Sequence, residues 1–435
     1  MKQTTKDLFD FISSSPTSFH TVKTITENLK SEGYSELSEA ETWNINFGGK
    51  YFVTRNLSSV IAFRIPSSTP SGYMITAAHG DSPSFKIKKN SESETAGLYT
   101  RINTEKYGGM IYSSWLDRPL SCAGRVTYLD GNSVVSKIID IKKQLFLIPS
   151  VAIHMNRAVN ENTTYNAAID MQPISGSLAA KGEYEKLLAE ASGCKVSDIL
   201  ASDMFLYSLE PGTVWGIKDE FISSPRLDDL QCVFGAYKGF ISAKASNACP
   251  VLCVYDNEEV GSETKQGAAS TFLKDTLVRI NDALGNCRSD YLKALATSFM
   301  VSADNAHAVH PNHPEYADTA HRPEMNKGIV IKHNANQRYT TDSVSAALFS
   351  AICLKAKVPV QHFFNRSDMV GGSTLGNISN TKVSINTVDI GLPQLSMHSS
   401  YETAGTLDTD YLIKALTEFF GTELVSVSPD KLTIK

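Results

Sequence analysis

The sequence has no long apolar run and no Cys-x-x-Cys pair. No stretch approaches the ~20 apolar residues that a membrane-spanning helix needs, and residues 1–7 contain no apolar core of a signal peptide. Its seven cysteines are single and widely scattered, which does not fit a disulfide framework and favours a reducing compartment. We therefore expect a cytoplasmic protein without a membrane partner.

The sequence also lacks an excess of basic residues. Lys and Arg number 41 against 46 Asp and Glu, which gives a net charge of −5 and a pI near 6.1. This balance gives no reason to expect nucleic acid as a partner. Hydrophobic residues make up 42% of the chain and charged residues 20%, as in ordinary globular proteins. A length of 435 residues favours two domains over one compact core.

The hydrophobic pattern changes twice along the chain. Strand patterns fill much of residues 87–180, with few helical periods before residues 181–192. From residue 227 onward strands alternate with amphipathic helices, which is typical of an α/β sheet flanked by helices. We predict a discontinuous α/β domain of residues 1–86 and 222–435, with a mixed sheet, interrupted by a β-rich assembly domain of residues 87–221. Helices are predicted at 229–244, 268–284 and 343–357, and strands at 51–53, 60–63, 73–78, 250–255, 298–302, 360–364 and 383–389.

Two adjacent acidic residues, Glu258 and Glu259, directly follow the apolar strand predicted at 250–255. Burying a carboxylate without a partner is costly, so such a pair needs cations beside it. One carboxylate can then bind a metal ion while its neighbour transfers protons, as metal-assisted hydrolysis requires.

Other metal-type ligands stand in similar positions. Ligands occur after an apolar strand or before a helix at His79 with Asp81, at Asp228 with Asp229, at Asp304 and at His398. Sites in open α/β sheets gather beyond the carboxyl ends of the strands, so these residues can converge. Imidazoles with carboxylates suit zinc-like ions. Asp81 faces the same way as His79 in an extended segment and can fix its tautomer.

Simpler interpretations compete at single positions. Either aspartate of the 228–229 pair could be an ordinary helix N-cap. Asp117 is interpreted as a partner of Arg118 or as a turn cap. Four histidines are interpreted as surface or hydrogen-bonded residues: His20, His321, His333 and His362. Prolines break any helix that would align His307, His310 and His313, so these three are not interpreted as a separate metal cluster.

Taken together, the motifs resemble those of the aspartyl aminopeptidase and aminopeptidase I family of metallopeptidases over nearly the whole chain. They occur in this order: 78–83 (Ala-His-Gly-Asp-Ser-Pro), 114–120 (Ser-Trp-Leu-Asp-Arg-Pro-Leu), 153–157 (Ile-His-Met-Asn-Arg), 227–228 (Leu-Asp), 256–262 (Asp-Asn-Glu-Glu-Val-Gly-Ser), 302–312 (Ser-Ala-Asp-Asn-Ala-His-Ala-Val-His-Pro-Asn) and 394–399 (Gln-Leu-Ser-Met-His-Ser).

The resemblance implies an exopeptidase with two divalent ions, usually Zn²⁺, although Mn²⁺ and Co²⁺ accept the same ligands. Asp228 would bridge both ions, with His79 and Asp304 at one and Glu259 and His398 at the other. Glu258 would be the general base. The resemblance also implies a cis peptide between Asp228 and Asp229.

The resemblance further implies a pocket for the substrate's first side chain. Lys332 would pair with an acidic N-terminal residue, with Tyr339 and His307 nearby, whereas a solvated strand lysine is the simpler interpretation. A preference for neutral residues stays open, as does a catalytically silent scaffold; a related deacylase or carboxypeptidase fits less well.

The same resemblance implies a homo-oligomer, a tetrahedral dodecamer that admits peptide substrates. His154, in the β-rich domain, would then reach a neighbouring subunit's site.

Overall fold

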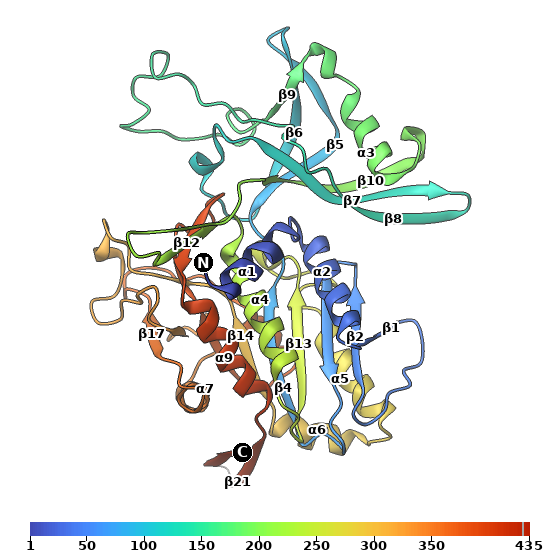
Figure 1. Cartoon of the computed structure of the whole chain (residues 1–435), viewed down its shortest axis with the longest axis vertical. Helices are drawn as coiled ribbons and strands as arrows, with labels where there is room; N and C mark the ends of the chain where they lie inside the picture. The colour runs from blue at the N-terminus through green and yellow to red at the C-terminus, as the bar shows by residue number, and fades with distance from the viewer. Residues whose placement is uncertain (429) are drawn as a thin grey trace.

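The computed structural model describes residues 1–428 and 430–435. Its largest sheet has nine strands in the order β1-β2-β3-β13-β4-β14-β18-β16-β17 and mixes parallel with antiparallel pairs (Figure 1). The mixed α/β fold predicted from the sequence is confirmed. The strands are β1 (Ser35–Leu37), β2 (Lys50–Arg55), β3 (Ser59–Arg64), β4 (Tyr73–His79), β13 (Cys249–Tyr255), β14 (Phe299–Ala303), β16 (Ile329–His333), β17 (Val360–Phe364) and β18 (Asn386–Gly391).

Helices cover both faces of this sheet. Every residue of β4, β13 and β14 is buried, which explains their nearly continuous apolar sequences. One apolar cluster lies under α1 (Gln3–Ser13), α2 (Ser18–Ser31), α4 (Leu227–Ser242), α7 (Ser343–Lys355) and α9 (Asp408–Phe420). The other lies under α5 (Phe272–Ala283), α6 (Arg288–Ala296) and α8 (Leu375–Asn380).

A second sheet of six antiparallel strands stands at one end of the molecule, at the top of Figure 1. Its order is β8-β7-β10-β5-β6-β9, and it has its own apolar cluster. The elements are β5 (Ser84–Thr95), β6 (Tyr99–Tyr107), β7 (Leu120–Asp130), β8 (Ser133–Asp140), β9 (Ile174–Ser177), β10 (Ile199–Ser208) and α3 (Glu183–Ser192).

A smaller sheet, β11-β12-β20-β19-β15, brings together segments that are far apart in the chain. Its strands are β11 (Thr213–Trp215), β12 (Phe221–Ser224), β15 (Ala306–His307), β19 (Pro393–Leu395) and β20 (Glu402–Gly405). Strand β12 ends just before Asp228, and the β19–β20 connection holds His398. The last pair, β21 (Leu424–Ser428) with β22 (Lys431–Ile434), closes the chain.

The predicted helices and strands are confirmed in type, with shifted ends. The strand predicted at 383–389 begins only at Asn386, and the helix predicted at 268–284 begins at Phe272. The sequence did not predict α6 or α9. Of the residues that the structure describes, none belongs to a helix with the length and apolarity of a membrane span.

Candidate metal centre and adjoining pocket

Four candidate site residues lie at or just after the ends of three neighbouring strands. His79 is the last residue of β4, Asp304 follows β14, and Glu258 and Glu259 form a 3₁₀ turn just after β13. Strands β13 and β14 both pair in parallel with β4, so their carboxyl ends meet at one edge of the sheet. The convergence expected from the sequence is therefore observed.

Asp228, at the start of α4, lies between two histidines from distant parts of the chain. Its Oδ1 is 3.6 Å from Nε2 of His79, and its Oδ2 is 3.4 Å from Nε2 of His398. The same nitrogen of His398 is 3.4 Å from Oε2 of Glu259. One buried carboxylate thus faces two separate imidazoles, each through a different oxygen.

Candidate ligand atoms fall into three overlapping groups, each within 4.8 Å. Besides the ligands that the resemblance implies, they include Asp229, whose Oδ2 accepts a hydrogen bond of 3.2 Å from the backbone N–H of His79. The Asp228–Asp229 peptide is cis, as the resemblance implies. The groups are His79, Asp228, Asp229 and Asp304; His79, Glu258 and Glu259; and Asp228, Glu259 and His398.

Some carboxylate oxygens of the cluster are unpaired. Within the described residues, Oδ1 of Asp228, Oδ1 of Asp229 and Oε1 of Glu259 are buried without a hydrogen-bond partner. Buried oxygens of this kind need a cation or a proton. Oxygen and imidazole donors in such a cluster fit a zinc-type ion, and the cluster can therefore hold metal.

Burial and mutual repulsion shape the charges of the metal-free cluster. Burial raises the pKa of Glu258 to about 8, and His79 only partly offsets this effect. Burial likewise raises the pKa of Glu259, with Asp228 adding to it. Asp228 behaves differently: burial would raise its pKa, but the facing imidazoles of His398 and His79 lower it below the usual range. Without a cation, the site therefore retains protons on several of its acids.

Asp81 lies beside Nδ1 of His79, as the sequence predicts. Nδ1 of His79 lies 3.1 Å from the backbone oxygen of Asp81 and 3.4 Å from its Oδ1. The carbonyl is the closer acceptor, because the chain turns after β4. The carboxylate also accepts hydrogen bonds of 3.2 Å from the backbone N–H groups of Glu258 and Glu259.

A pocket of about 210 Å³ adjoins the cluster. It brings Lys332, Tyr339 and His307 together with Glu258, as expected from the sequence. Lys332 is buried, with Nζ 3.4 Å from Oδ1 of Asp304 and 5.6 Å from the centre of the Tyr339 ring. The interpretation of Lys332 as a solvated lysine is therefore wrong. Partial desolvation of the ring, followed by the charge of Lys332, lowers the pKa of His307, although the residue keeps an exposed side.

Two acids at this edge differ in exposure. The Glu258 side chain lines the pocket and is 14% exposed, whereas that of Glu259 is 3% exposed and faces the interior. Glu258 can therefore reach a bound molecule, while Glu259 can reach only the buried cluster.

Glu402, in β20, was missed in the sequence. It is buried and accepts hydrogen bonds from the backbone N–H groups of Asp228, at 2.9 Å, and His398, at 2.7 Å. Burial raises its pKa to about 8. No local pattern marks this residue, because its partners come from other segments.

The other histidines stay outside the cluster. His154 is exposed in the segment 151–170, so its predicted role beside a neighbouring subunit stays a prediction. His20 contacts Thr17, His321 contacts Asp318, and His333 contacts His362, which confirms their interpretation as hydrogen-bonded residues. The expected Asp117 pair is wrong: Asp117 accepts hydrogen bonds from Ser150, and Arg118 pairs with Glu210.

A mixed sheet with a buried histidine–carboxylate cluster at its carboxyl edge defines a metal-dependent hydrolase class. Similarity to known proteins identifies the family within that class. The family model described as aminopeptidase I zinc metalloprotease (M18) matches residues 11–420. A probable M18 family aminopeptidase 2 of Clostridium novyi is 47% identical over 95% of this chain and 98% of its own length.

Solved structures agree with these relatives. A chain in the cryo-EM structure of the Ape4 and Nbr1 complex matches with a TM-score of 0.93 and 36% identity, over 96% of this chain and 85% of that one. The S. cerevisiae mApe1 dodecamer matches with a TM-score of 0.84 and 29% identity, over 95% of both chains. The chain belongs to the M18 family of aminopeptidases, and it is a metallopeptidase that hydrolyses peptide bonds.

Proposed function

We propose that the enzyme removes acidic N-terminal residues from peptides with two divalent cations and Glu258 as general base. The observation that carries the proposal is the position of Asp228 between His79 and His398, with a different oxygen facing each. A carboxylate in that position can serve two ions at once.

Under this proposal, Asp228 is the shared ligand. His79 and Asp304 complete one ion site, and Glu259 and His398 complete the other. The unpartnered buried oxygens support this assignment. Zn²⁺ fits this donor set, although Mn²⁺ and Co²⁺ also bind such ligands. Bound cations would neutralise the buried charge and make a water molecule more acidic.

Glu258 then moves the proton. It takes a proton from the attacking water and returns it to the departing amine, which is general acid–base catalysis. Its position on the pocket wall supports this role, because a base must reach the reacting atoms. Glu402 and Asp81 hold the backbone on either side of the cluster through the hydrogen bonds described above.

Lys332 provides the preference for acidic residues. An ammonium group buried at the pocket wall favours a substrate carboxylate, because an apolar side chain of the substrate would offer it no opposite charge. Preference for neutral residues is the competing function, because Asp304 already pairs with Lys332. A silent scaffold fits less well, since it has no need of a buried acidic cluster.

The enzyme is further proposed to be a cytoplasmic homo-dodecamer of tetrahedral form, with residues 87–221 as its assembly domain. The dodecameric S. cerevisiae relative supports this proposal. So do the exposed apolar side chains around His154, namely Val151, Ile153 and Met155. His154 would then enter the pocket of a neighbouring subunit and polarise the substrate carbonyl.

Anilides of Asp, Glu and Leu, together with an N-acyl amino acid, test the activity with and without a chelator. We expect rapid, chelator-sensitive hydrolysis of the Asp and Glu anilides and none of the N-acyl compound. Faster cleavage of the Leu anilide would refute the acidic preference, and activity unaffected by full metal removal would refute the mechanism. Light scattering on the native particle tests the assembly.

A further inference from the structure

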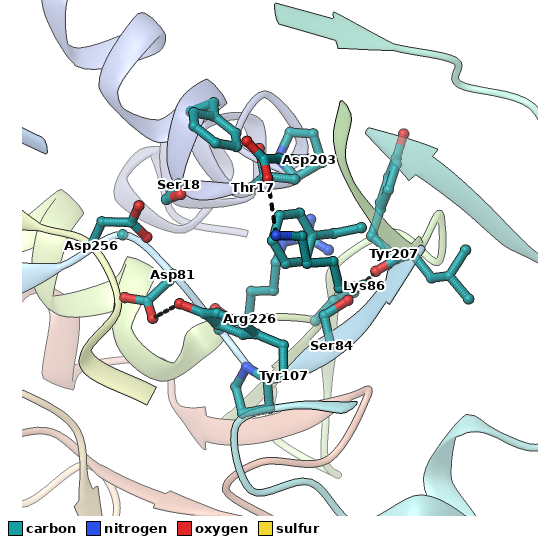
Figure 2. A pocket seen from close by; sticks show the side chains of 18 of the residues that line it. Thr17, Ser18, Asp81, Ser84, Lys86, Tyr107, Asp203, Tyr207, Arg226 and Asp256 are labelled. Carbon is teal, nitrogen blue, oxygen red and sulfur yellow. Dashed lines mark hydrogen bonds and ion pairs between the residues drawn. The ribbon is translucent and has the colours of Figure 1, made fainter. Parts of the chain in front are cut away.

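Residues 107–111, which we call the strap, lead out of β6 and pass along the metal centre. The hydroxyl of Tyr107 donates a hydrogen bond of 2.7 Å to Oδ2 of Asp81 (Figure 2). At the other end, the backbone N–H of Ile111 donates one of 3.0 Å to the carbonyl of His398. One short segment of the antiparallel sheet thus touches both sides of the cluster.

The register of β5 with β6 explains how Tyr107 reaches this place. Ser84, the first residue of β5, pairs with Tyr107, the last residue of β6. Asp81 precedes Ser84 by one short turn, so it lies beside the end of β6. Because side chains alternate between faces along a strand, a slip of one residue would turn the phenol away from Asp81. The ring is held by edge-to-face packing on Phe205 at 5.3 Å.

The Tyr107 hydroxyl connects two groups that hold the Glu258–Glu259 turn. Asp81 accepts the backbone N–H groups of both glutamates, and the phenol is its shortest side-chain donor. The hydroxyl also accepts a hydrogen bond of 2.9 Å from Nδ2 of Asn257, the residue before the turn. Removing this single oxygen would therefore take one hydrogen bond from the Asp81 carboxylate and leave Nδ2 of Asn257 without its partner, which is costly in a half-buried site.

The glycines of the strap allow its close approach. A Cβ on Gly108 would lie 3.1 Å from Cβ of Glu259, and its φ of +77° disfavours other residues. A Cβ on Gly109 would lie 3.9 Å from Nδ1 of His398. Backbone therefore packs directly against both proposed ligands of one ion.

We propose that Tyr107 is a positioning residue of the metal centre, which acts through Asp81 on the Glu258–Glu259 turn. The strap thereby makes the antiparallel sheet part of the active centre of its own chain, besides any part it has in assembly. This inference rests on the proposed function, in which Glu258 is the base and Glu259 a ligand. Burial and nearby carboxylates raise the pKa of Tyr107, so its phenol stays a donor throughout the working pH range.

Tyr107→Phe tests the inference, because it removes the oxygen and keeps the ring. Tyr207→Phe is the matched control: its hydroxyl bonds Asp140 at 2.5 Å, away from the cluster. Zn²⁺ affinity is measured on stripped protein by competition with a chromophoric chelator, together with kcat, KM and the pH profile. We expect Tyr107→Phe to lose up to about 10-fold in Zn²⁺ affinity, the lower end of the effect of losing a ligand's own hydrogen-bond partner, because Tyr107 acts through Asp81, and to lower kcat more than KM.

A second pair of variants covers the case in which Tyr107→Phe does not fold. Gly108→Ala places a methyl group against Glu259, whereas Gly97→Ala in the same hairpin has φ +64° and no atom within 4 Å of the added carbon. Both carry similar backbone strain, but only Gly108→Ala should weaken Zn²⁺ binding. Unchanged Zn²⁺ affinity in both Tyr107→Phe and Gly108→Ala would overturn the inference.

Glu258→Gln separates the inference from the function on which it rests. If Glu258→Gln is inactive while Tyr107→Phe binds Zn²⁺ and turns over like the control, only the positioning role fails. If Glu258→Gln keeps full activity, the proposed function itself fails.

Discussion

The ammonium nitrogen of Lys332 lies 3.4 Å from the carboxylate of Asp304, and both side chains are buried. Burial alone would lower the pKa of Lys332, but Asp304 and its other neighbours raise it, so the side chain stays cationic. Asp304 also belongs to a candidate ligand group. A cation bound at Asp304 would offset the negative charge of this carboxylate. The ammonium group of Lys332 would then be available to pair with a substrate carboxylate.

Lys332→Met should therefore change specificity more than catalysis. The substitution keeps an unbranched side chain and removes the charge, so kcat/KM for Asp and Glu anilides should fall about 100-fold or more. Turnover of the Leu anilide should be equal or higher. Lys327→Met, at an exposed position before β16, is the control. An equal fall for all three anilides would show that Lys332 serves the metal centre alone.

Glu258→Gln should lower kcat by about 10²–10⁴-fold, the usual contribution of a general base. KM and bound metal should change little, because the proposed ligands remain. Glu263→Gln, on the same loop but exposed, should behave like the unaltered enzyme. Steady-state kinetics with metal analysis by mass spectrometry measures both effects, and loss of metal together with activity would make Glu258 a ligand instead.

Metal binding should release protons at neutral pH. Before a cation binds, burial raises the pKa of Glu258 to about 8, so this acid is mostly protonated at pH 7, and burial also raises the pKa of Glu259. A cation binds the ionised forms of these acids, so metal binding displaces their protons. The affinity for the metal ion should therefore increase about tenfold per pH unit for each proton released, up to about pH 8. Calorimetry in buffers of different ionisation enthalpy counts the protons. Identical heats in all buffers would contradict this prediction.

His20 should make the fold sensitive to acid. Burial, with Lys23 and other cations adding to it, lowers its pKa from 6.5 to about 3. The unfolded chain therefore binds a proton below pH 6.5 that the folded chain does not, so stability is fully present above pH 6.5 and declines as pH falls. The decline amounts to about 2 kcal/mol by pH 5.

His20→Gln isolates this contribution, since it can keep the contact with Thr17 without titrating. The urea midpoint of the unaltered protein should fall relative to that of the variant between pH 8 and pH 5, because only His20 binds a proton on unfolding. Parallel midpoints across this range would mean that His20 titrates normally in the folded state.

Much of the metal centre could be predicted from the sequence. His79, Glu258 and Asp304 each follow an apolar strand, and the carboxyl ends of parallel strands meet at one edge whatever the detailed packing. The helices α4, α5 and α7 were predicted for a similar reason, since their periodicity is local.

Other features depended on contacts that no local pattern records. Glu402 and Tyr107 reach the centre only because β20 pairs with β12 and β6 pairs with β5 in one register. The sequence by itself determined which segments carry ligand chemistry, because strand ends and side-chain types are local properties. Only the tertiary structure decided that Lys332 is buried against Asp304 and that the Asp81 carboxylate also holds the Glu258–Glu259 turn, because those outcomes depend on how distant backbones align.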